Sequence, residues 1–184
     1  MSQYVTDPAK IRVLLTKTPS LEAKLANLRI SLQVAYRQGT GIIAEPEEIM
    51  EAMALHNVIS DMPHSAPSPG DKMNNIIDGY QKILNTEFDL LCKGINNQIF
   101  VIDSVINRIG NGISKLSEEQ RTVIVLKYWE MRFWKQIQDT TRFSENQVKS
   151  YHRTGIERLC AVTNIDIESY DFCMEQLDGK EGQG

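Results

Sequence analysis

Apolar residues recur from Met73 to Ile109 at a mean spacing of about 3.5 residues, over more than thirty residues. Such a period is typical of a long amphipathic helix with a coiled-coil-like seam. At about 1.5 Å per residue this helix would be on the order of 50 Å long, more than one small globule could cover. We therefore expect its apolar stripe to meet other helices of the chain or a second copy of the chain.

Further helices are expected on both sides of this stretch. Proline follows a helix-capping residue at Pro8 and again at Pro19, which predicts two consecutive helices, the second ending near Gly39. Another short helix is expected after Pro46. Strand-like alternation is absent over any useful length. The predicted fold class is all-α, with N-terminal helices that include one long coiled-coil-like helix.

The sequence lacks the motifs of enzymes and cofactor sites. The three histidines, His56, His64 and His152, place no pair on one helix face, which argues against a zinc site. The glycines Gly110 and Gly112 follow a helix and lack the third glycine of a dinucleotide fingerprint. We expect no enzyme activity, no metal and no cofactor. Three cysteines without a C-x-x-C pair, and no apolar run of roughly 20 residues, predict a soluble cytoplasmic protein without a membrane partner.

Residues 116–159 carry the most informative pattern. Ser117, with Gln120 three residues later, predicts a capping box at a helix start. A short helix is expected over 133–140 and a turn over 141–143, before Ser144 caps a longer helix. The apolar residues expected to face inward are Val123, Ile124, Leu126, Tyr128, Trp134, Ile137, Val148, Tyr151, Ile156 and Leu159. This is the plan of a helix-turn-helix unit, whose last helix enters the DNA major groove.

The region-four helix-turn-helix of bacterial sigma factors resembles two segments of this chain, LSEEQRTVIVLKYWE and FWKQIQDTTRFSENQVKSYHRTGIERL. The variant of this helix-turn-helix that the chain resembles occurs in phage and prophage regulators such as the ArpU and RinA groups. Those regulators also place coiled-coil-like sequence and a Pro/Ser/Gly-rich loop before the motif. The close resemblance covers about 44 of the 184 residues. It implies a C-terminal three-helix, sigma-like domain that binds DNA and docks on RNA polymerase.

Three positions depart from the sigma pattern. Sigma-type motifs usually have a small residue at the position of Gln138, an aliphatic residue at Thr141 and glycine at Arg142. A left-handed backbone at Arg142 would cost roughly 1 kcal/mol that glycine avoids. The spacing from Ser144 to Leu159 keeps the family's pattern.

The last helix is predicted to offer polar residues to DNA. Asparagine and lysine can bond base edges, lysine and arginine can neutralise phosphates, and polar groups at the helix N-terminus can bond the backbone. Composition alone favours an ordinary solvated face, and the three-helix pattern reverses that preference. His152 by itself is more typical of a surface histidine. The predicted DNA-binding residues are Ser144, Glu145, Asn146, Gln147, Lys149, Ser150, His152 and Arg153.

Trp129, Phe133 and Trp134 form an aromatic group where the first two helices of this domain meet. Core packing is the default explanation for such a group. The alternative, implied by the sigma resemblance, is a hydrophobic contact with RNA polymerase. The sequence leaves both interpretations open.

Charge and composition divide the chain into segments. The run PHSAPSPG holds three prolines, two serines and a glycine, which indicates a loop. Residues 115–160 carry 9 Lys/Arg and 6 Asp/Glu, a net +3, whereas 161–184 carry 1 and 6, a net −5. We expect the acidic end to mask the basic surface. The expected segments are an N-terminal helical region at 1–62, a loop at 63–72, the long helix at 73–112, the helix-turn-helix domain at 113–162 and an acidic tail at 163–184.

The preferred hypothesis is a phage- or prophage-type transcriptional regulator in the cytoplasm of a bacterial host. Its expected partners are double-stranded DNA, RNA polymerase and a second copy bound through the helical N-terminal part. One alternative is a DNA-packaging subunit similar to a small terminase, for which a closed ring of many copies would be diagnostic. Another is a sigma-like adaptor that binds polymerase or another protein without DNA, because the net charge of +3 is small.

Overall fold

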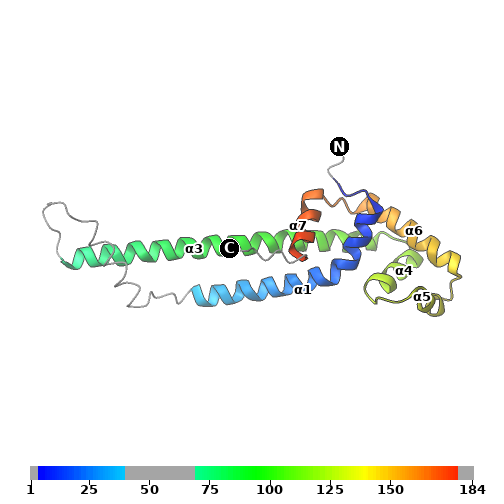
Figure 1. Ribbon diagram of the computed structural model, residues 1–184, viewed down its shortest axis with the longest axis horizontal. Coiled ribbons are helices and arrows are strands. Elements are labelled where there is room, and N and C mark those ends of the chain that lie inside the picture. The colour runs from blue at the N-terminus through cyan, green and yellow to red at the C-terminus, as the bar shows by residue number, and fades with distance from the viewer. Residues whose placement is uncertain (1–3, 40–68, 178–184) are drawn as a thin grey trace. The chain divides into compact units, whose positions relative to one another are not determined.

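The computed structural model describes residues 4–39 and 69–177 of the 184-residue chain, and these residues are almost entirely helical (Figure 1). The predicted all-α class is confirmed. In the described ranges the one strand-like feature is an isolated antiparallel bridge between Tyr4 and Asp166. The short helix expected after Pro46 lies outside these ranges. The described helices are α1 (Pro8–Gly39), α3 (Pro69–Ser114), α4 (Glu118–Tyr128), α5 (Trp134–Thr141), α6 (Glu145–Val162) and α7 (Ile167–Leu177).

Helix α1 is one continuous helix, so the prediction of two consecutive helices was wrong. The first start is as expected, because the Ala9 N–H donates to Oδ1 of Asp7 at 2.8 Å. Pro19 lies inside the helix, although it has no N–H for the backbone ladder. Buried leucines on both sides of it, such as Leu15 and Leu21, belong to one core, and this packing outweighs the local break.

The described residues form two compact units. Residues 4–28 and 98–177 belong to the first unit, and residues 29–39 and 69–97 belong to the second. The helical N-terminal region and the long helix therefore each contribute to both units, in contrast to the expected division along the sequence. Helix α3 also begins at Pro69, inside the expected loop, and continues to Ser114.

The core of the first unit joins distant parts of the chain. Leu14, Ile102, Ile124, Leu159 and Ile165 are each at most 1% exposed and share one apolar cluster. They come from α1, α3, α4, α6 and the segment before α7. The helix-turn-helix region is therefore not a separate domain, because its first and last helices are built into this cluster.

The expected acidic tail is instead part of the core as far as Leu177. Ile165 and Cys173 are completely buried, and Tyr170 is 7% exposed. The Val5 N–H donates to the Ile165 carbonyl at 2.7 Å, which ties this segment to the N-terminus. Apolar residues between the acidic ones thus pack inward, so residues 163–177 are not a loose mask for the basic surface. Residues 178–184 lie outside the described ranges.

Gly112 allows a close helix contact. A Cβ atom at this position would lie 2.7 Å from Cγ2 of Thr163 and 3.1 Å from Cδ2 of Leu159. Gly110 and Gly112 were expected to follow a helix, yet α3 includes both. The missing side chain at Gly112 lets the end of α3 lie directly against the end of α6.

In the second unit, α1 and α3 pack through aromatic residues. The ring of Tyr36 meets the ring of Phe88 edge-on, with 6.0 Å between their centroids. Cys92, one turn further along α3, is 4% exposed. None of the described helices has a stretch long and apolar enough to cross a lipid bilayer.

Candidate nucleic-acid interface

Helices α4, α5 and α6 pack around a small apolar cluster of their own. Val123 and Leu126 of α4, Ile137 of α5 and Val148 of α6 are each at most 7% exposed. Trp134, Phe143 and Tyr151 cover this cluster as half-buried side chains. The predicted inward face is confirmed at Val123, Leu126, Trp134, Ile137, Val148 and Tyr151, whereas Phe143 was expected only in the turn.

Polar caps set where the helices begin. Ser117 Oγ accepts from the Gln120 N–H at 3.3 Å, and the Ser117 N–H donates to Oε1 of Gln120 at 3.2 Å. Ser144 and Gln147 repeat this arrangement at the start of α6, with the Ser144 N–H donating to Oε1 of Gln147 at 2.8 Å. Ser144 and Gln147, which were predicted to bond the DNA backbone, therefore also form the N-terminal cap of α6.

The turn between α5 and α6 depends on a left-handed residue. Arg142 has φ 60° and ψ 19°, and its N–H donates to the Gln138 carbonyl at 2.7 Å. The Thr141 hydroxyl donates to the Ile137 carbonyl at 2.7 Å and accepts from the Phe143 N–H at 3.4 Å. Side-chain hydrogen bonds from Thr141 therefore support a turn in which sigma-type motifs usually use glycine.

Arg142→Gly is expected to raise the free energy of unfolding by a few tenths to about 1 kcal/mol, because glycine has no Cβ to clash in this conformation. Urea denaturation monitored by circular dichroism would measure the change. Asn164 is also left-handed, with φ 47°, and asparagine tolerates this region better than arginine. Asn164→Gly should therefore raise the free energy of unfolding by less than Arg142→Gly does. A lower free energy of unfolding in Arg142→Gly would contradict the argument that Arg142 is strained.

The outward side of α6 carries most of the predicted DNA contacts. Its inward side is fixed by Val148, Gly155, Ile156 and Leu159, which are all buried. Seven of the eight predicted residues are exposed: Ser144, Glu145, Asn146, Gln147, Lys149, Ser150 and Arg153. A helix with one polar face free in solution and its other face anchored has the arrangement that groove binding requires.

Charges on this outward side are balanced. Lys149 Nζ lies 2.5 Å from Oε1 of Glu145, and both side chains are about 60% exposed. The hydrogen bond from Lys149, together with its charge, lowers the pKa of Glu145. Arg153 makes no ion pair with any described residue, and Glu157 follows it one turn later. Arg153 is therefore the cation of this helix side best placed to meet a phosphate.

His152 does not belong to the outward side, so its predicted position was wrong. Its Nε2 lies 2.9 Å from the Tyr128 hydroxyl, its ring stacks on Tyr128, and Trp134 meets it edge-on at 5.0 Å between centroids. Burial lowers the pKa of His152 from an ordinary value near 6.5 to about 4, and the Arg12 and Lys127 cations add to this shift. Its neutral imidazole helps to join α4, α5 and α6.

Stability should fall as the pH drops from about 6.5 towards 4. The unfolded chain protonates His152 near 6.5, whereas the folded chain resists protonation until about 4, so acid favours the unfolded state in this window. Comparing the pH dependence of urea denaturation in wild type and His152→Gln isolates this residue from His56, His64 and the carboxylates. A His152→Gln curve parallel to that of wild type would contradict the assignment.

The three residues of the aromatic group, Trp129, Phe133 and Trp134, lie in different environments. Trp129 packs against the main core, and Trp134 packs against the small cluster beneath the Lys127 ammonium, which lies 4.6 Å from its ring. Phe133 is 74% exposed, and its neighbour Met131 is 57% exposed. Core packing therefore accounts for the two tryptophans, and Phe133 remains a candidate contact for another protein.

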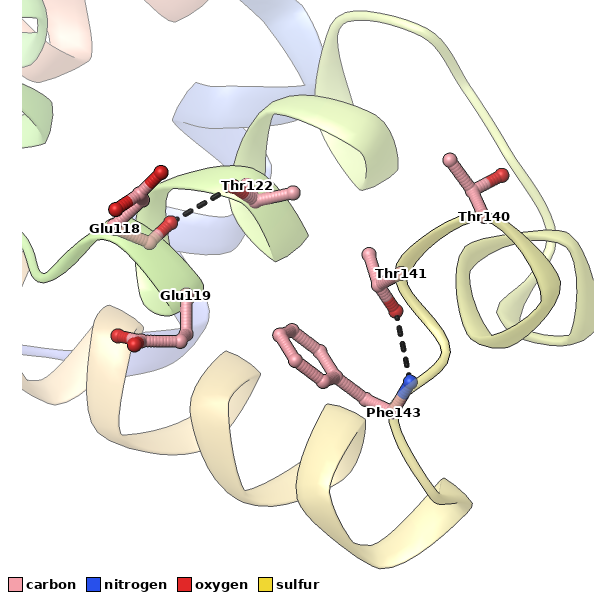
Figure 2. A pocket seen from close by; sticks show the side chains of 6 residues that line it. All are labelled: Glu118, Glu119, Thr122, Thr140, Thr141 and Phe143. Carbon is pink, nitrogen blue, oxygen red and sulfur yellow. Dashed lines mark hydrogen bonds between the residues drawn. The ribbon is translucent and has the colours of Figure 1, made fainter.

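A shallow hollow of about 320 Å³ lies beside this turn and was not foreseen from the sequence. Its threonine hydroxyls donate to carbonyls of their own helices, as Thr122 does to Glu118 at 2.8 Å. Figure 2 shows the carboxylates of Glu118 and Glu119 on the side of the hollow away from Thr140 and Thr141. The polar groups do not converge on a common point, so the hollow has no arrangement for catalysis.

No family model, no curated protein and no solved structure matches this chain. The resemblance to sigma region four and to the ArpU and RinA groups therefore rests on the residues quoted above.

Proposed function

We propose that the chain is a transcriptional regulator of phage or prophage type that binds specific sites in double-stranded DNA through α6. The observation that carries this proposal is the outward side of α6, where Asn146, Ser150 and Arg153 are exposed on successive turns. Amide, hydroxyl and guanidinium groups at this spacing can meet base edges and phosphates along a major groove. The left-handed turn at Arg142 and the Ser144 cap support the start of such a helix.

The charge balance favours a mode of binding that depends on few phosphate contacts. Helix α6 carries Lys149, Arg153 and Arg158 against Glu145 and Glu157, so its net charge is only +1 and α6 alone would attract DNA weakly. A useful affinity then requires base contacts together with a second half-site or a partner protein. This is consistent with a regulator that acts as a dimer or with RNA polymerase.

Arg153→Ala should weaken DNA binding and reduce the slope of log affinity against log salt by about one unit, because one phosphate contact is lost. Fluorescence anisotropy with labelled fragments of the source genome at several salt concentrations measures both quantities. Lys93→Ala is the matched control, since Lys93 is an exposed cation on α3. Equal effects of the two substitutions would show that α6 is not the binding helix.

A protein adaptor is the second candidate function, and the exposure of Phe133 and Met131 favours it. Large apolar side chains that remain in water two residues apart in the sequence can contribute to a surface that another protein covers. This candidate replaces the first if wild-type protein captures RNA polymerase, binds no DNA, and loses the polymerase in Phe133→Ala.

A further inference from the structure

Two cations from outside α6 lie beside His152 of that helix. Lys127, at the end of α4, lies 4.6 Å from the ring of Trp134, and this ring meets the His152 ring edge-on. Burial lowers the pKa of His152 to about 4, and the two charges that add to this shift are Arg12 and Lys127. Burial raises the pKa of Tyr128, and Arg12 opposes that rise. Arg12 of α1 therefore lies at the place where α4 and α6 meet.

The core fixes the position of Arg12 relative to α4 and α6. Its neighbours Ile11 and Leu15 are at most 2% exposed and belong to the same apolar cluster as Tyr128 and Ile156. The Arg12 side chain is exposed and makes no hydrogen bond or ion pair in the part of the chain that the structure describes. Arg12 is thus a cation on a rigid support without a counter-ion.

Most carboxylates near this edge of α6 already have a basic residue beside them. Three such pairs occur on α6, on the turn before α5 and on α5: Glu145 with Lys149 at 2.5 Å, Glu130 with Arg132 at 2.7 Å, and Asp139 one turn after Lys135. None of these pairs neutralises Arg12 or Lys127.

Two further carboxylates lie towards the other end of α6. Asp7 and Glu157 raise the pKa of Cys160, where the charge of Arg12 acts against them. Cys160 follows His152 by eight residues, about 12 Å along the helix. Oδ1 of Asp7 also accepts the Ala9 N–H at 2.8 Å. The positive charge is therefore concentrated at the His152 end of this edge.

The edge of α6 that holds His152 is where a DNA strand would pass. His152 follows the exposed Lys149 by three residues, so it borders the outward side of the helix. A helix about 10–12 Å in diameter fills a major groove about 12 Å wide, which brings a phosphate strand to each of its edges. Cations beside His152 are then close to phosphates rather than to bases.

We propose that Arg12 and Lys127 bind backbone phosphates of the DNA strand that runs along this edge of α6. This proposal rests on the proposed function. Since α6 itself has a net charge of only +1, cations from other helices would supply much of its attraction to DNA. Phosphate contacts from α1 and α4 would also fix the orientation of α6 in the groove without reading the sequence.

Salt titration of the full chain, bound to a labelled genome fragment that it retains, tests this proposal. Arg12→Ala should reduce the slope of log affinity against log salt by about one unit. Raising the salt from about 50 to about 200 mM should then weaken wild-type binding about three- to fourfold more than Arg12→Ala binding. Lys127→Gln should act in the same way, and the double variant should lose about two units of slope.

Two further variants serve as controls. Arg12→Lys keeps the charge and should keep the slope. Arg29→Ala removes an exposed arginine about 25 Å further along α1 and should leave the slope unchanged. Circular dichroism checks that every variant remains helical.

Interference by phosphate ethylation identifies the contact itself. Ethylation of at least one phosphate should weaken wild-type binding and have no effect on Arg12→Ala. Identical interference patterns, or equal effects of Arg12→Ala and Arg29→Ala, would overturn the contact from α1. If Arg153→Ala lowers the slope and Arg12→Ala does not, α6 binds DNA and this proposal is wrong. A wild-type protein that retains no genome fragment would overturn both proposals.

Discussion

Ile165→Ala is expected to lower the free energy of unfolding by about 2–5 kcal/mol, the usual cost of truncating a buried isoleucine. Ile165 is completely buried in the cluster that joins α1, α3, α4, α6 and α7. Its carbonyl also accepts the Val5 N–H at 2.7 Å, so its surroundings are fixed and cannot collapse easily into the cavity. Urea denaturation followed by circular dichroism measures the loss.

The matched control for this prediction is Ile167→Ala. Ile167 lies two residues later in the chain and is 37% exposed, so the same truncation should cost less than about 1 kcal/mol. Similar losses for the two variants would mean that residues 163–177 are not core.

Asn146→Ala should lower affinity for the preferred DNA site by about 1–3 kcal/mol and leave nonspecific binding nearly unchanged. Asn146 is exposed on the outward side of α6, within the first turn after the Ser144 cap. This end of a recognition helix usually supplies the base contacts. An uncharged amide contributes little to phosphate attraction, so its loss should affect specificity more than general affinity.

Titration of the preferred site and of a scrambled fragment at the same salt concentration measures this difference. Asn97→Ala on α3 is a control with the same chemistry at another exposed position. If Asn146→Ala weakens both fragments equally, the residue acts through the fold or through the phosphates. If it weakens neither, Asn146 makes no base contact.

Features encoded by nearby residues were predictable from the sequence. The capping boxes at Ser117 and Ser144 depend on residues three positions apart, and both occur in the structure. The left-handed conformation at Arg142 follows from the need for a tight turn between two helices. The inward residues of α4 and α6 follow from helical period alone.

Features that depend on distant packing were not predictable in the same way. Leucines before and after Pro19 enter one core, which keeps α1 continuous, and no local pattern indicates this. The charge of residues 161–184 suggested an acidic tail that covers the basic surface, whereas Ile165, Tyr170 and Cys173 are buried in the core. His152 did have an available signal, since it follows Val148 by four residues and so shares its side of α6.

Capture of source-genome fragments by the full chain is the most direct measurement of DNA recognition through α6. Fragments retained by wild-type protein would be sequenced, and their affinities would be compared with those of scrambled fragments at the same salt concentration. We expect enriched fragments to share a sequence and to bind at least about a thousandfold more tightly than scrambled DNA. Uniform recovery of all fragments, with equal affinity for scrambled DNA, would contradict sequence-specific binding by this protein.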